Sequence, residues 1–289
     1  MIKIDADLET LKAQVDALVP TWRTRGAKRT SKFLKQKGYE EKTSIWSEVK
    51  SVFMNLHPNK CVYCERDMAG EEFGSGEYDL EHYRPKGRIE PYPTTADGVT
   101  YSFSTGNSQP KGYYWLAYDL ENYAVSCITC NRGLKADRFP IAGTRGTALS
   151  SVTELNQIEL PLLIFPLRDD PEEFITFIGT TPIPKVKQGL KFQRALVTIT
   201  FFRLADEKRE ELYAARVKTI CELWTQFEII QTTQTASKKT AAQKRIDTLC
   251  SPKSGHSACA KAFVAMLQND PERAWQIYED VVNYEPPQN

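Results

Sequence analysis

The chain has 289 residues, of which 41% are hydrophobic and 11% aromatic, enough to bury a core in one large domain or two modest ones. Its formal net charge is +1, so composition selects neither nucleic acid nor an acidic ligand as partner. No stretch approaches the roughly 18 apolar residues of a membrane span, and the acidic N-terminal segment does not resemble a signal peptide. We therefore expect a cytoplasmic protein without a membrane partner.

Residues 1–58 are predicted to form an N-terminal helical segment. Apolar residues recur every three or four positions in residues 6–18 and again in residues 43–56, which predicts two amphipathic helices, the first stopped by Pro20. Residues 22–37 lie between them and hold seven Lys or Arg and no acidic residue. This stretch is either a loop or a polar helix, and its charge is either a solvated face or a contact with nucleic acid.

Residues 59–145 lack the helical pattern of the first segment, because short strand-like pieces alternate with turns. They contain two Cys-x-x-Cys pairs, Cys61/Cys64 and Cys127/Cys130. In a reducing compartment such pairs are better metal ligands than disulfides, and four thiolates can close a tetrahedral structural Zn²⁺ site. The alternative is four reduced, buried cysteines. The 62 residues between the pairs exceed a zinc-ribbon spacing, so a segment is inserted there.

Within that insertion, residues 91–112 are rich in Gly, Pro, Ser and Thr and are predicted to be a long loop. Residues 113–119 and 123–127 are aromatic or β-branched enough to predict short strands, and residues 130–137 could open a helix. Residues 146–190 are predicted to be a linker with a strand-like segment. Residues 191–289 are predicted to be a mainly α-helical domain that is structural or binds a partner.

Two features of the C-terminal part are specific enough to check. Residues 206–230 are predicted to form a helix capped by Asp206, and residues 271–282 a final helix that begins near Pro271. The apolar stripe of the first helix is read as core packing. The other cysteines, Cys221, Cys250 and Cys259, lack paired spacing and are read as packing residues or free thiols. The fold class predicted for the chain is α+β.

A possible catalytic site combines Glu81 and His82 with two asparagines, Asn122 and Asn131, which lie nine residues apart around the second cysteine pair. A hard divalent cation needs oxygen ligands, which the Glu81 carboxylate and the Asn131 amide can supply. A histidine beside such an ion can activate water, and an amide carbonyl can hold the imidazole in the right tautomer. This set suits metal-assisted cleavage of a phosphodiester bond.

These residues resemble the HNH nuclease motif, the ββα-metal finger, in its zinc-containing form with four cysteines. The resemblance implies that Glu81 is the first ligand of the catalytic ion and His82 the general base. It implies that Asn122 orients that base and that Asn131 is the second metal ligand. The catalytic ion would be Mg²⁺ or Mn²⁺, with Zn²⁺ as a third candidate. The family more often has Asp at the position of Glu81, which puts the geometry around the ion in question.

A longer resemblance, over residues 46–218, is to the PtuB family of HNH subunits in Septu antiphage systems and in retrons that carry a Septu-like pair. It is carried by "CVYCE", "DLEHYRPKG", "YYWLAYDLEN", "SCITCNRGLKADRFP" and "PLLIFPLRDDPEEF". It implies an ABC-type, SMC-like ATPase partner, PtuA, and a role in antiphage defence. A retron reverse transcriptase with its non-coding RNA or DNA is a further implied partner.

Four readings stay open at this point. Lys86, Arg132 and Lys135 flank the predicted site and either contact substrate phosphates or are solvated. Asp79 is a second ligand, a group that supports the ligands from outside, or part of a turn or salt bridge. The substrate is expected to be DNA, with tRNA or other RNA as the alternative. The rival to an endonuclease is a zinc-ribbon scaffold that binds nucleic acid or protein without cutting.

Overall fold

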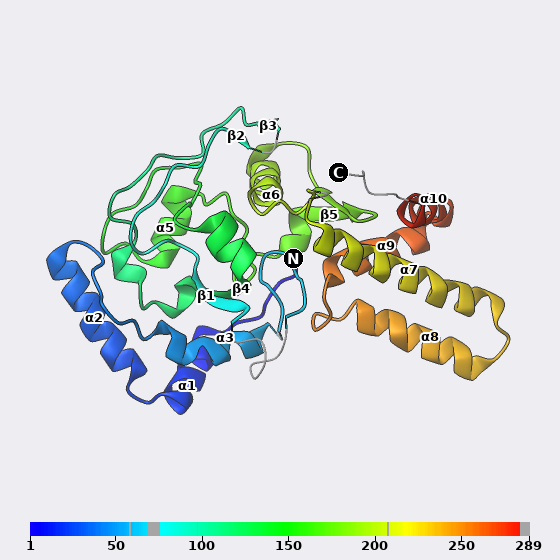
Figure 1. The fold of residues 1–289 in the computed structure, drawn as a ribbon, viewed down its shortest axis with the longest axis horizontal. Helices are drawn as coiled ribbons and strands as arrows, with labels where there is room; N and C mark the ends of the chain where they lie inside the picture. The colour runs from blue at the N-terminus through cyan, green and yellow to red at the C-terminus, as the bar shows by residue number, and fades with distance from the viewer. Residues whose placement is uncertain (58, 69–75, 97, 207, 284–289) are drawn as a thin grey trace.

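The computed structural model describes residues 1–57, 59–68, 76–96, 98–206 and 208–283. Helices surround a small central pair of antiparallel strands (Figure 1). The N-terminal helices lie at one end of the molecule, and a hairpin of two long helices, α7 and α8, projects at the other. The mixture of helices and two-stranded sheets confirms the predicted α+β class.

The N-terminal segment is helical, as predicted, and its polar stretch is also a helix. Helix α1 (Leu8–Leu18) is capped by Asp7, whose carboxylate accepts from the Thr10 amide, and it ends just before Pro20. The charged stretch forms α2 (Trp22–Gln36), which settles one of the open alternatives. The second predicted helix is broken into a 3₁₀ turn, η1 (Trp46–Val49), and a short α3 (Lys50–Leu56).

The centre of the molecule is an antiparallel pair of strands followed by a short helix. Strand β1 (Tyr78–His82) pairs with β4 (Tyr123–Cys127), so that Tyr78 faces Cys127 and His82 faces Tyr123. The chain then turns into a π-helix, η4 (Thr129–Lys135). Because side chains alternate along a strand, Asp79 and Glu81 share one face of β1 and His82 belongs to the other. Strand β4 and this helix match the predicted elements.

The strand predicted for residues 113–119 is wrong. The chain instead forms two 3₁₀ turns, η2 (Tyr114–Leu116) and η3 (Leu120–Asn122). All six residues from Tyr113 to Tyr118 are buried, without the alternation of a half-buried strand. A short, continuously buried apolar run satisfies a helical turn as well as a strand, which is why composition misled the prediction.

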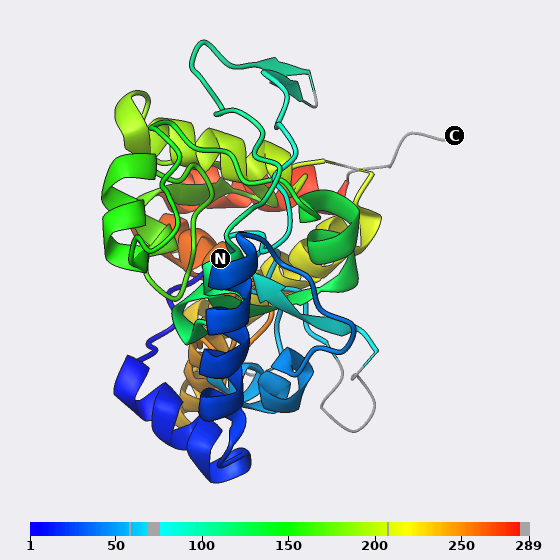
Figure 2. The same cartoon turned by 90° about the vertical axis from the view of Figure 1, so that its left-hand side faces the viewer.

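The predicted long loop at residues 91–112 contains little regular structure. Two two-residue strands, β2 (Thr95–Ala96) and β3 (Val99–Thr100), form a small hairpin that projects from the body (Figure 2). At the base of the hairpin, Tyr92 and Tyr101 are buried, and the Tyr92 ring packs on Phe201. The insertion is therefore fastened to the C-terminal part by aromatic contacts.

The rest of the chain is mainly helical, with one further strand pair. Asp206 does not cap α7, which begins four residues later, after Arg209. The predicted final helix is confirmed and begins at Pro271. The elements are α5 (Val152–Glu159), η5 (Pro171–Glu173), β5 (Ile175–Ile178), β6 (Thr181–Pro184), α6 (Gly189–Phe201), α7 (Glu210–Thr232), α8 (Ala236–Leu249), α9 (Ser257–Asn269) and α10 (Pro271–Val282).

Buried apolar residues from Met1 to Val281 form one connected core, so the strand pair and cysteines are packed against both helical parts. The apolar segment predicted in the linker is part of this core, with Leu162, Leu163 and Ile164 fully buried. The predicted domain boundaries stay a prediction. None of the helices in the described part of the chain is long and apolar enough to cross a bilayer.

Candidate metal and catalytic centre

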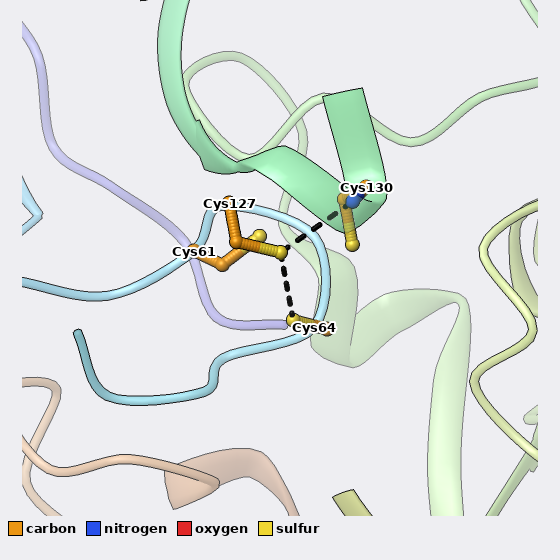
Figure 3. Close-up of side chains that lie close together, drawn as sticks. All are labelled: Cys61, Cys64, Cys127 and Cys130. Carbon is orange, nitrogen blue, oxygen red and sulfur yellow. Dashed lines mark hydrogen bonds between the residues drawn. The ribbon is translucent and has the colours of Figure 1, made fainter. Parts of the chain in front are cut away.

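Four cysteines meet beside the end of β4. Cys61 and Cys64 come from the loop before β1, Cys127 ends β4, and Cys130 lies in η4 (Figure 3). All four are buried, and their sulfur atoms lie within 4.8 Å of one another. Two knuckles far apart in sequence thus supply one cluster, as their spacing predicted.

The geometry of the cluster fits a zinc ion. Cys64 Sγ and Cys127 Sγ are 3.9 Å apart. Four ligands at the usual Zn–S distance of about 2.3 Å on a tetrahedron lie about 3.8 Å from each other, whereas disulfide-bonded sulfurs lie about 2.05 Å apart. Hydrogen bonds from the other three thiols, Cys130 first, lower the pKa of Cys127 and favour its thiolate, whereas burial raises the pKa of Cys61 and the hydrogen bond with Cys127 raises that of Cys130. The four cysteines could therefore hold a structural zinc.

Arg209, just before α7, reaches the cluster from the C-terminal part of the chain. Its guanidinium is buried and lies 3.7 Å from Cys130 Sγ, while it donates to the Phe202 carbonyl at 2.9 Å. A zinc ion with four thiolates carries a net charge of −2, which a buried cation compensates. Sequence reasoning missed this residue, because 79 positions separate it from Cys130.

On the opposite side of β1 from His82, Glu81 is paired with Lys135. The Lys135 ammonium lies 2.7 Å from Glu81 Oε1 and donates to the His82 carbonyl at 2.9 Å. Both side chains are 1–2% exposed. Burial raises the pKa of the Glu81 carboxyl, and the neighbouring ammonium opposes that shift. Sequence reasoning left Lys135 open between a contact with phosphates and a solvated surface; the side chain is buried, and its ammonium is committed to Glu81.

His82 is held by one backbone acceptor and two aromatic rings. Its Nε2 lies 3.1 Å from the Ala117 carbonyl oxygen, which can only accept, so Nε2 carries the proton. Nδ1 is then an acceptor, and it has no hydrogen-bond partner among the described residues. Trp46 and Tyr123 pack edge-to-face on the imidazole at 5.1 and 5.0 Å. Burial, and then the charge of Lys86, lower the pKa of His82 well below the ordinary value. The ring is thus neutral near pH 7.

Among the described residues, the hydrogen bonds of Asn122 go to backbone groups and not to the His82 ring. Its amide oxygen accepts from the Arg84 backbone N–H at 2.8 Å, and its amide nitrogen donates to the carbonyls of Arg84 and Leu116. Asn122 therefore ties the chain leaving β1 to the turn that carries Ala117. Any effect that it has on the orientation of His82 passes through this backbone.

Asn131 and Arg132 meet at Asp79. Asn131 donates to Asp79 Oδ2 at 3.0 Å, and the exposed Arg132 binds both carboxylate oxygens at 2.5–2.6 Å. Asp79 thus has a salt-bridge role, and it lies on the same strand face as Glu81. Asp79, Glu81 and Asn131 supply the oxygen donors that a hard divalent cation prefers, so this donor set fits Mg²⁺ or Mn²⁺ by type.

Lys86 lies over two aromatic rings close to His82. Its ammonium is 4.4 Å from the centre of the Trp46 ring and 5.4 Å from that of Tyr39. Burial lowers the pKa of Lys86, and the charge of Glu81 opposes that shift. Sequence reasoning did not predict the residues that contact His82 and Lys86, which are Trp46, Tyr123, Tyr39 and the backbone carbonyl of Ala117. A contact made by a backbone atom leaves no signal in a sequence.

Comparison with known proteins adds one line of support. The chain is 26% identical over 233 residues, 79% of its length, to Septu protein PtuB of Bacillus mycoides (strain KBAB4), and the match covers 70% of that protein. The chain is similar to a Septu protein. This likeness to PtuB supports the predicted relation to Septu systems. No protein-family model matches the chain, and no solved structure matches it significantly.

Proposed function

We propose that the chain is a metal-dependent HNH endonuclease that acts as an effector subunit in antiphage defence. The observation that carries the proposal is the strand–strand–helix unit β1–β4–η4, which carries Glu81, His82 and Asn131 and is joined to the four-cysteine cluster through Cys127 and Cys130. The similarity to a Septu protein supports the defence role. The catalytic ion would be held by Glu81 and Asn131.

The protein's own residues suggest a division of labour. His82, neutral and with Nδ1 free, accepts the proton of the attacking water while its Nε2–H stays bonded to Ala117. Asn122 keeps the turn that carries this carbonyl in place. A divalent ion bound here would stabilise the charge that develops on the phosphate and the leaving oxygen. The four cysteines, with a zinc ion bound, would hold the two ends of the unit together.

The partner and substrate extend the same proposal. An ABC-type, SMC-like ATPase of the PtuA kind would be the partner, and DNA the preferred substrate, with tRNA or other RNA as the alternative. Lys86 and Arg132 are the cations nearest the site that could contact phosphates: Arg132 is 67% exposed, and Lys86 is half-buried. A retron reverse transcriptase and its nucleic acid are the further proposed partners.

One observation favours a second candidate, a zinc-stabilised scaffold that does not cut. Glu81 is neutralised by Lys135, and the Asn131 amide is turned toward Asp79. A metal ion at Glu81 would have to lie beside a buried ammonium, or displace it, which costs free energy.

A phage challenge distinguishes the two. Cells that express the chain together with its ATPase should survive infection, and His82→Ala should abolish survival while Lys238→Gln, on the distant α8, should preserve it. Sequencing the nucleic-acid ends formed during infection should show breaks in wild type that His82→Ala lacks. Protection by His82→Ala at the wild-type level would favour the scaffold.

A further inference from the structure

The arginines and the lysines of the basic helix α2 have different surroundings. Each of its arginines is paired with an acid: Arg23 with Asp16, Arg25 with Glu48, and Arg29 with Glu41. The lysines Lys28, Lys32, Lys35 and Lys37 are exposed, and among the described residues none of them has an acidic partner. The arginines thus bind the helix to its neighbours and the lysines are left to solvent.

Three of these lysines lie on one face. Lys28, Lys32 and Lys35 are four and three residues apart, so at 100° per residue they fall within about 60° of each other around the helix. At 1.5 Å per residue they span about 10 Å along it. Phosphates recur about every 3.4 Å along the axis of one DNA strand, so a span of about 10 Å extends over about three phosphates. Helix α2 contains no acidic residue that would repel them. The helix lies at the surface, toward the viewer in Figure 2.

The other face of α2 is locked to the candidate catalytic site. Phe33 packs on Tyr39 at 5.0 Å and stacks on Tyr118 at 6.2 Å. Tyr39 lies under the Lys86 ammonium, and Tyr118 contacts Trp46, which packs on His82. Gly26 allows this close approach, since a Cβ there would lie 3.2 Å from Tyr118 Cβ. Two contacts therefore separate α2 from Lys86, and two separate it from His82, since Trp22 of α2 packs on Tyr123, which packs on His82.

We propose that the lysine face of α2, formed by Lys28, Lys32 and Lys35, binds the phosphate backbone of the nucleic acid whose cleavage site lies at His82. This inference rests on the proposed function, because it takes nucleic acid as the substrate. Backbone contacts of this kind are independent of sequence and fix the register of the substrate. The rigid aromatic link makes the binding face and the site move as one body.

The test compares two triple variants that remove the same charge from opposite ends of the molecule. One is Lys28→Gln, Lys32→Gln, Lys35→Gln on α2; the matched control is Lys238→Gln, Lys239→Gln, Lys244→Gln on α8, whose lysines are equally exposed. Binding of a labelled DNA duplex and of a labelled single-stranded RNA is measured by fluorescence anisotropy at several salt concentrations, without added Mg²⁺ or Mn²⁺. Circular dichroism checks that both variants are folded.

We expect the α2 variant to bind the preferred nucleic acid at least about tenfold more weakly than wild type at 0.1 M salt. The slope of log affinity against log salt concentration should decrease in magnitude by about 2 to 3, because three lysines are removed. The α8 control should stay within about twofold of wild type. Equal losses in both variants, no loss in the α2 variant, or no binding by wild type at low salt would each overturn the inference.

A cleavage assay run beside the binding assay separates this inference from the proposed function. If the α2 variant loses binding and neither wild type nor His82→Ala cuts, the nucleic-acid-binding face is supported and the proposed nuclease is contradicted. If the α2 variant binds normally and His82→Ala abolishes cleavage, the proposed nuclease is supported and the binding face on α2 is contradicted. Binding that is lost for an acidic protein partner but not for nucleic acid would likewise contradict the inference.

Discussion

At the scale of single residues, the end of β1 places the candidate catalytic residue His82 close in sequence to a structural anchor, Arg84. His82 presents a free Nδ1, whereas Arg84, two residues on, is fully buried. The Arg84 guanidinium donates to Glu159 at 2.8 Å and to Asn156 at 2.8 Å, and it lies over the Phe139 ring. Arg84 therefore fastens the end of the strand to α5 and leaves His82 in a fixed position.

Glu159→Gln tests this anchor. Removing one partner of a buried ion pair leaves the other charge uncompensated, and we expect the free energy of unfolding to fall by about 3–5 kcal/mol. Chemical denaturation measures it. The matched control is Glu173→Gln, which breaks the pair with Lys191 on the surface, where both side chains are more than half exposed. That change should cost far less, because solvent screens an exposed ion pair. Similar losses in both variants would contradict a special role for Arg84.

A second prediction at this scale concerns the two histidines outside the site. Burial, with the nearby charges of Lys60 and Arg216, lowers the pKa of His57 and of His256 to about 4 from an ordinary 6.5. Between pH 6.5 and 4 the unfolded chain therefore binds protons that the folded chain does not. The stability that these neutral histidines contribute is fully present above pH 6.5 and is lost as the pH falls toward 4.

We expect His256→Asn to reduce this pH dependence. Asn tolerates the left-handed backbone of position 256, where φ is 53°. The difference in unfolding free energy between wild type and variant should shrink by about 2 kcal/mol from pH 7.5 to pH 5. Denaturation at the two pH values provides the measurement. A difference that is the same at both would show that His256 is not held neutral by the fold.

At the scale of elements, β4 and η4 form one unit with the cysteine cluster. Cys130→Ser should lower the zinc content from about one ion per chain toward none, because the fourth thiolate of a closed site is lost. It should also lower the melting temperature by several degrees. Cys221→Ser is the control, since Cys221 lies on α7 away from the cluster. Elemental analysis that finds full zinc in Cys130→Ser would contradict the assignment.

The same elements show what a sequence can and cannot predict here. Cysteine spacing predicted the cluster, periodicity predicted α1 and α7, and the position of Pro271 predicted the start of α10, because these signals depend on local pattern alone. Two other contacts depend on how η4 packs on β1, which local pattern does not show. They are the ion pair of Glu81 with Lys135 and the hydrogen bond from the Asn131 amide to Asp79. The 3₁₀ turn at Tyr114–Leu116 was missed because its aromatic run fits a strand equally well.

At the scale of the whole molecule, the candidate centre lies between two helical parts that differ in their attachment. The N-terminal helices contact it through rings, such as Trp46 on His82, and the C-terminal part contacts the cysteines through Arg209. The α7–α8 hairpin projects at the end of the molecule opposite to the N-terminal helices (Figure 1). The lysine face of α2 and this hairpin are thus separate surfaces, one proposed for nucleic acid and the other at the far end of the molecule.

The central claim, that this chain is a nuclease that uses His82, is tested most directly by cleavage with purified protein. Wild type and His82→Ala, each together with the ATPase partner, are incubated with DNA or RNA in the presence of Mg²⁺ or Mn²⁺, beside the Lys238→Gln control. We predict metal-dependent cleavage by wild type and the control, and a loss of at least about 100-fold in His82→Ala, because a general base contributes that much or more. Equal behaviour of wild type and His82→Ala in every condition would contradict the claim.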